Sequence, residues 1–201
     1  MNGEHATANV VTALEELRIQ YMLVGSFSTN FYGIARSTRD ADIVIQLNEA
    51  TLTDLQQRLG SEFKIDMQMS FETATGTKRN VVKLADSDFK IELFRLSLDA
   101  HDQERFRRRE RVFVQQLGHE AFVPTVEDVV VFKLRWAVEA GRLKDREDLR
   151  DVIAVQRGQL DWTYVHRWTA EHGTRACLDE IVRSIPADLL APGAYPLTDA
   201  T

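Results

Sequence analysis

Residues 21–45 read YMLVGSFSTNFYGIARSTRDADIVI and join two apolar segments through a small-residue turn and an acidic pair. The first segment, residues 21–24, is typical of a buried strand, and Gly25-Ser26 ends it. The second apolar segment follows Asp40 and Asp42 directly. Because side chains alternate along a strand, the two carboxylates are expected on one face and the apolar residues around them on the other.

An acidic pair in this position is suited to a divalent cation. Two like charges held side by side repel each other, and a cation between them removes that penalty. Mg²⁺ binds few protein carboxylates and completes its shell with water and substrate phosphates. We therefore expect Mg²⁺, or Mn²⁺ in its place, at Asp40 and Asp42. The alternative is an acidic pair at a solvated strand edge.

The turn and the acidic pair together resemble a known signature. The pattern is similar to the motif of the polymerase-β-like nucleotidyltransferase superfamily. That motif reads hydrophobic-Gly-Gly/Ser, then a spacer, then Asp-hydrophobic-Asp/Glu-hydrophobic. Within it, Arg36-Ser37-Thr38-Arg39-Asp40-Ala41-Asp42 resembles the Arg-x-Thr-x-Asp-x-Asp form of the AbiEii-like branch and of related uncharacterised bacterial nucleotidyltransferases. The resemblance implies an α/β (α+β) fold, in which a small mixed β-sheet core with flanking helices is followed by a helical subdomain. It also implies transfer of a nucleoside monophosphate from a nucleoside triphosphate.

A third carboxylate is expected on a later strand, because two metal ions in such displacements need more ligands than one acidic pair supplies. In residues 89–94, FKIELF, the apolar alternation leaves Glu92 on the face opposite Ile91 and Leu93. The resemblance implies an acid at this point, usually Asp, so Glu92 departs from the family pattern. A solvent-facing strand glutamate is the alternative, and Asp66 and Asp99 are the other candidate acids.

Phosphate binding is expected around the turn. A helix starting near Ser26 would offer free amides and a partial positive charge to the β- and γ-phosphates, although Ser26 could also act only as a helix cap. Arg36 matches the family arginine and could bind triphosphate oxygens in a bidentate manner. Thr38 and Arg39 flank the acids, and an ordinary surface ion pair is equally compatible with Arg39.

A second resemblance lies near the C-terminus. The sequence there is similar to the "Glu-Asp…Lys-Leu…Lys-Asp-x-x-Asp" pattern of the same branch. The matching residues are Glu-Asp at 127–128, Lys133-Leu134 and the run from Lys144 to Asp151. The resemblance makes Lys133 a phosphate or nucleotide contact. A lysine in an apolar helix must otherwise snorkel or pair with an acid. Asp145 and Asp148 share a helix face and could hold Lys133 or the metal site, while a solvated face also explains Asp148.

Composition narrows the class of protein. The chain has 201 residues and a net charge of −6, which argues against a general nucleic-acid coat. Cys177 is the only cysteine, so no intrachain disulfide can form and a reducing compartment is expected. The first residues lack a basic flank and an apolar core, and no apolar run reaches the ~20 residues that span a bilayer. These features predict a cytoplasmic protein without membrane contact.

Three regions are predicted: an α/β core over residues 1–122, a helical subdomain over 123–186 and an irregular tail over 187–201. In the core we expect helices near residues 10–17, 26–33 and 51–60, and strands at 21–24, 43–45, 63–67, 80–84 and 89–94. Residues 85–88 are expected to form a hairpin connection. Beyond Thr125, helices are expected from about 126 to 137 and near 144–156, 161–171 and 174–184.

The first functional hypothesis is nucleotidyl transfer to a tRNA or protein hydroxyl, in a toxin or defence role with a possible cognate antitoxin as partner. Antibiotic-type transfer to a small molecule is the second, and a non-catalytic nucleotide- or protein-binding relic is the third. Residues 101–111 hold five arginines and three acids, which could guide RNA or form a salt-bridged helix end. The sequence leaves these alternatives open.

Overall fold

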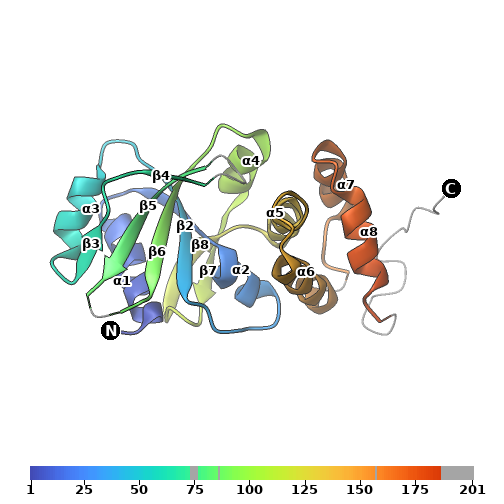
Figure 1. Cartoon of the computed structure of the whole chain (residues 1–201), viewed down its shortest axis with the longest axis horizontal. Helices are drawn as coiled ribbons and strands as arrows, with labels where there is room; N and C mark the ends of the chain where they lie inside the picture. Colours follow the sequence, from blue (N-terminus) through green and yellow to red (C-terminus); the bar gives the residue numbers. More distant parts are fainter. Residues whose placement is uncertain (73–76, 86, 157, 187–201) are drawn as a thin grey trace. The chain divides into compact units, whose positions relative to one another are not determined.

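The computed structural model describes residues 1–72, 77–85, 87–156 and 158–186 (Figure 1). They form two compact units. The first, the sheet unit, comprises Met1–Ser28 and Arg36–Pro124. The second, the helical unit, comprises Thr29–Ala35 and the described residues after Pro124.

The sheet unit is built on a mixed sheet. Its strands are β1 (Gln20–Val24), β2 (Asp40–Gln46), β3 (Phe63–Ile65), β4 (Ser70–Glu72), β5 (Thr77–Leu84) and β6 (Lys90–Arg95). The strand order is β1-β2-β6-β5-β3, and β4 also pairs with β5. Only β2 and β6 run parallel, while the other pairs are antiparallel. This mixed sheet with flanking helices confirms the predicted fold class.

One face of this sheet carries the main core, because the alternating apolar residues of β1, β2, β5 and β6 all point to it. Helices α1 (Gly3–Glu16) and α3 (Leu52–Leu59) cover that face, and Figure 1 shows α1 behind the strands. Each helix begins where a side chain caps it: Asn2 accepts from the amide of His5, and Thr51 accepts from that of Asp54.

A β-hairpin and a short helix complete the sheet unit. Strands β7 (Glu110–Val114) and β8 (His119–Val123) pair antiparallel and add apolar side chains to the main core. Helix α4 (Ala100–Arg108) sends Phe106 to the opposite face of the sheet, where it packs with Met22, Val24 and Val44. That opposite face is the one that carries the acidic pair.

The helical unit contains α5 (Val126–Glu139), α6 (Leu143–Gln156), α7 (Trp162–Glu171) and α8 (Arg175–Arg183) around their own apolar core. Thr125 caps α5 by accepting from the amide of Asp128, and Asp161 caps α7. Tyr32, from the end of α2 (Gly25–Tyr32), belongs to this core, and its carbonyl accepts from Gln156 Nε2. The four helices expected after Thr125 are confirmed.

Four local expectations differ from the structure. Helix α1 begins at Gly3, well before residue 10, where the first helix was expected to begin. Helix α2 begins at Gly25, so Ser26 lies inside its first turn instead of capping it. Strand β3 ends at Ile65, two residues earlier than expected. Strand β4 and the β7–β8 hairpin were not anticipated. The expected connection at 85–88 joins antiparallel neighbours, although Asp86 and the tail 187–201 lie outside the described residues.

Among the described residues, no helix combines the length and the apolar character that crossing a membrane requires.

The free thiol of Cys177 is expected to react slowly with iodoacetamide. The residue is 8% exposed, and burial raises the pKa of its thiol, with only partial opposition from Arg146, whose Nη1 lies 3.4 Å from Sγ. A higher pKa leaves less thiolate at neutral pH. We expect alkylation at least about tenfold slower in the native protein than in urea. Equal rates in the two states would show that the thiol is accessible in the folded chain.

Candidate functional site in the sheet unit

The strand register brings the predicted acids together. Asp42 is the partner of Val24 on β1 and of Glu92 on β6. Neighbouring strands lie about 4.8 Å apart and partnered side chains share a face, so Asp42 and Glu92 stand side by side. Asp40 is two residues earlier on β2 and faces the same way. Asp40, Asp42 and Glu92, called here the acidic trio, therefore occupy one face of two adjacent strands.

The backbone of Gly25 packs directly against the carboxylate of Asp42. It directly follows β1 and opens α2 with a φ of +61°, a conformation that favours glycine. A Cβ placed on Gly25 would lie 2.0 Å from Asp42 Oδ2, far inside van der Waals contact. Only glycine therefore lets the carboxylate approach the start of the helix so closely.

The residues before β2 are arranged around the turn and the first acid. Thr38 donates through its hydroxyl to Asp40 Oδ1 at 3.0 Å, which orients that carboxylate. Arg36 Nη2 lies 3.2 Å from Ser26 Oγ and donates to it, so Arg36 contacts the first turn of α2. Arg39 is exposed. The start of α2 thus carries backbone amides, a hydroxyl and a guanidinium at one end of the acidic trio.

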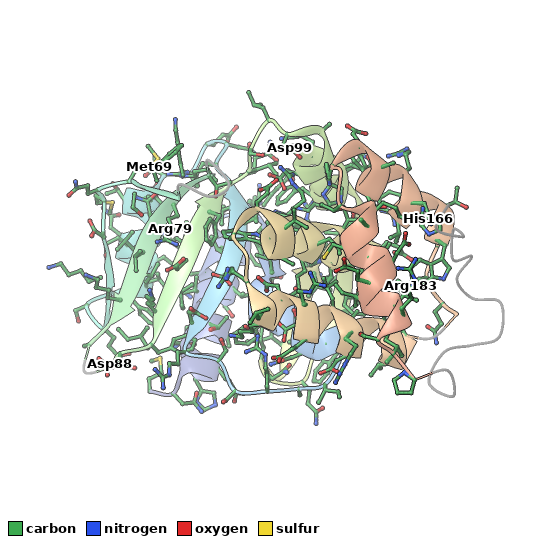
Figure 2. The ribbon with its side chains drawn as sticks, turned by 45° about the vertical axis from the view of Figure 1, so that its right-hand side comes forward. Met69, Arg79, Asp88, Asp99, His166 and Arg183 are labelled. Carbon is green, nitrogen blue, oxygen red and sulfur yellow. The ribbon has the colours of Figure 1, made fainter. Side chains whose placement is uncertain are left out.

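Glu92 is held by two cations, Arg79 and Lys90, that the sequence analysis did not name. Its Oε2 accepts from Arg79 Nη1 at 2.7 Å, and its Oε1 lies 3.2 Å from Lys90 Nζ. The side chain is only 7% exposed, so a solvent-facing strand glutamate is wrong. Figure 2 labels Arg79, which stands on β5 next to β6. The contact with Lys90 could have been predicted from the sequence, since residues two apart on a strand share a face. The contact with Arg79 depends on the register in which β5 pairs with β6.

The acidic pair and Glu92 differ in how well they suit a divalent ion. Asp40 and Asp42 are half-buried carboxylates beside a helix start, which are hard oxygen donors of the kind that Mg²⁺ and Mn²⁺ accept. Both oxygens of Glu92 are instead bound by Arg79 and Lys90. Within residues 1–72, 77–85, 87–156 and 158–186, no three His, Cys, Asp or Glu side chains are grouped so that they could hold one metal ion. The aspartate pair fits a metal, and Glu92 as oriented does not.

Asp66 and Asp99, the other candidate acids, both make hydrogen bonds that stabilise local structure. Asp99 is the N-cap of α4 and accepts from the amides of His101 and Asp102 at 3.0 Å. Asp66 follows β3, which β5 separates from β6, and its carboxylate accepts from the amide of Gln68. Neither position neighbours Asp42 in the strand register.

Lys133 and its two acids form a buried cluster in the helical unit. Lys133 Nζ donates to Asp145 Oδ1 and to Asp148 Oδ2, each at 2.7 Å. All three side chains are at most 10% exposed, so the alternative of a solvated helix face for Asp148 is wrong. The pairing joins α5 to α6. A nucleotide contact by Lys133 stays a prediction.

Several arginines of residues 101–111 contact other residues of the same segment. Arg105 is buried and pairs with Asp102 at 2.9 Å, and Arg107 pairs with Glu104 at 2.7 Å. Arg109 lies over the ring of Phe106 at 4.2 Å. These contacts favour the salt-bridged helix end among the two explanations of the sequence.

The comparisons with known proteins concern the fold. No protein-family model matches the chain, and no curated protein matches it. The antibiotic-resistance factor ANT(2″)-Ia is similar in its solution structure, with 12% identity, coverage of 91% of this chain and 98% of that chain, and a TM-score of 0.56. Its crystal structure in complex with adenylyl-2″-tobramycin gives 12% identity, 86% and 98% coverage, and a TM-score of 0.57.

A third solved structure, an antigenic nucleotidyltransferase-like protein from Paracoccidioides brasiliensis, is 19% identical over 90% of this chain and 93% of that chain, with a TM-score of 0.51. At these identities the likeness concerns architecture, and it extends over nearly the full length of each solved chain. The chain therefore has the fold seen in nucleotidyltransferases.

Proposed function

We propose that the chain is a metal-dependent nucleotidyltransferase that transfers a nucleoside monophosphate from a triphosphate to an acceptor hydroxyl. The observation that carries the proposal is the contact of Asp42 with Gly25 at the start of α2, beside Glu92 in the strand register. In a nucleotidyltransferase fold, this contact joins a phosphate-binding helix start to a metal-binding carboxylate.

In the proposed reaction the acceptor oxygen attacks the α-phosphorus and forms a new P–O bond. The bond from the α-phosphorus to the bridging oxygen breaks, pyrophosphate leaves, and the acceptor proton passes to a base. A bound Mg²⁺ or Mn²⁺ would supply positive charge next to the phosphates. Asp40 and Asp42 would hold that ion, while the amides at the start of α2, Ser26 and Arg36 would bind the β- and γ-phosphates.

For the acceptor we retain a tRNA or protein hydroxyl in a toxin or defence role, to which the resemblance of residues 36–42 points. A small-molecule hydroxyl is the second candidate. It is supported by the likeness to ANT(2″)-Ia over 98% of that chain, one structure of which holds an adenylylated tobramycin. A nucleotide-binding relic without turnover is the non-enzymatic alternative, because Glu92 is occupied by Arg79 and Lys90.

The test is transfer of label from each α-labelled nucleoside triphosphate with Mg²⁺ to total tRNA, to cell protein and to a panel of aminoglycosides. We expect Asp42→Asn to reduce transfer at least about 100-fold. Mutating a residue that only hydrogen-bonds to a metal ligand already lowers metal affinity or activity ~10–100-fold. Asp88→Asn is the matched control, because Asp88 is exposed in the β5–β6 connection.

The labelled pool distinguishes the candidates. Label on tRNA or protein, with growth arrest on expression that Asp42→Asn relieves, supports the toxin role. Label on an aminoglycoside supports the small-molecule acceptor. Calorimetric binding of a triphosphate without label in any pool supports the relic, and the absence of both binding and transfer rejects the proposal.

A further inference from the structure

Two protein cations, Arg79 and Lys90, already lie beside the acidic trio at Glu92. Three carboxylates carry three negative charges, and two divalent ions would bring four positive charges to them. Here Arg79 and Lys90 already supply two positive charges at Glu92, through contacts of 2.7 and 3.2 Å. Their combined charge equals that of one Mg²⁺.

The contact of Glu92 with Arg79 is also difficult to replace, whereas Lys90 is 48% exposed. The glutamate side chain is 7% exposed and that of Arg79 is 27% exposed, so this pair is largely removed from water. A guanidinium keeps its proton, so Arg79 stays charged if Glu92 leaves it. Breaking such a pair leaves an uncompensated charge, which is costly in a partly buried setting. A metal ion can bind Glu92 only if its binding free energy exceeds the cost of breaking the ion pair with Arg79.

Arg79 is fixed from several sides. Its guanidinium lies 5.9 Å from the centre of the Phe94 ring, and its backbone carbonyl accepts from Ser70 Oγ on β4. Lys90 is two residues before Glu92 on β6 and is the register partner of Asp40, so it stands on the same face between the two kinds of acid. Arg79 is therefore held within the sheet, and Lys90 is an exposed cation on the same face next to the acidic pair.

We infer that this site takes one divalent cation, at Asp40 and Asp42, and that Arg79 and Lys90 at Glu92 take the place of a second. The inference rests on the proposed function. Glu92 is then a positioning residue, which holds two protein cations beside the triphosphate instead of ligating a metal. The site differs in this respect from one in which three carboxylates share two ions.

The number of bound ions tests the inference without requiring turnover. Mn²⁺ is titrated into the protein with each of the four α,β-methylene nucleoside triphosphates, and bound ions are counted by equilibrium dialysis and electron paramagnetic resonance. Two Mn²⁺ ions about 3.5–4 Å apart couple magnetically, whereas a single ion does not. We expect one uncoupled Mn²⁺ per protein–nucleotide complex in the wild type.

Three variants sharpen the result. Glu92→Gln is expected to keep a count of one ion, because the amide removes no ligand, but with a weaker affinity because Arg79 and Lys90 lose the negative charge that they face. Replacing both Arg79 and Lys90 with methionine frees Glu92 and is expected to admit a second, coupled ion. Lys83→Met is the matched control: Lys83 is the register partner of Lys90 on β5, is exposed, and should leave the count at one.

The outcomes separate this inference from the function on which it rests. Two coupled ions in the wild type, or loss of the only ion in Glu92→Gln, would overturn the single-ion site while leaving the nucleotidyltransferase proposal standing. A wild-type protein that binds neither nucleotide nor Mn²⁺ would overturn both. If the double methionine variant does not fold, the Arg79→Gln and Lys90→Gln double variant replaces it, and the wild-type count decides in any case.

Discussion

Lys133→Met is expected to lower the free energy of unfolding of the helical unit by about 3–5 kcal/mol, the usual cost of removing one partner from a buried ion pair. Lys133 Nζ donates to both Asp145 and Asp148, and no side chain of the three is more than 10% exposed. Methionine matches the length of the lysine stem but leaves two carboxylates facing each other without their shared cation. Arg142 Nε remains 3.6 Å from Asp145 Oδ2, but the repulsion between the two carboxylates is no longer offset by a cation that binds both.

Urea unfolding followed by tryptophan fluorescence measures this loss in the right place, because Trp136, Trp162 and Trp168 all belong to the helical unit. Lys144→Met is the matched control, since it makes the same exchange at an exposed position of α6 and should change stability by less than about 0.5 kcal/mol.

Neutralising the two acids should restore part of the stability. Adding Asp145→Asn and Asp148→Asn to Lys133→Met removes the uncompensated charge and should recover part of the loss. If Lys133→Met instead keeps wild-type stability and only weakens triphosphate binding, the lysine acts on the nucleotide, as the family resemblance implies, and the structural role is wrong.

The parts of the fold that could be predicted from the sequence have strong local signals. Strand β1 is a short continuous apolar run, which predicts a buried strand. In β2 and β6 the acids alternate with apolar residues, so the face of Asp40, Asp42 and Glu92 followed from a period of two. Helices α3, α5 and α7 begin at Thr or Asp caps, and the predicted starts agree with the structure.

The missed elements depend on contacts between distant residues. Strand β7 reads ERVFV and is largely exposed, so no apolar alternation marks it. The hairpin is placed by contacts such as Phe122 against Tyr21, whose ring centres are 5.7 Å apart across about half the chain. Arg79 likewise reaches Glu92 only because β5 and β6 pair in one register. No local pattern carries that information.

Gly25→Ala is expected to reduce nucleotidyl transfer as strongly as Asp42→Asn, although it adds only a methyl group. A φ of +61° costs a non-glycine residue about 1–2 kcal/mol, and the new Cβ would lie 2.0 Å from Asp42 Oδ2 and 2.9 Å from its Cγ. The carboxylate must move away from the start of α2, which separates the metal ligand from the phosphate-binding amides.

Gly118→Ala distinguishes this displacement from backbone strain. Gly118 has a similar φ of +70° in the β7–β8 turn, and a Cβ there meets nothing within 4 Å. Both variants should therefore lose about 1–2 kcal/mol of stability in thermal unfolding from the backbone conformation, and Gly25→Ala should lose more because Asp42 must also move. Only Gly25→Ala should lose Mn²⁺ and triphosphate binding by calorimetry. Equal binding by the two variants would mean that Asp42 does not need its contact with Gly25, and the phosphate turn and the metal carboxylate would then be independent parts of the site.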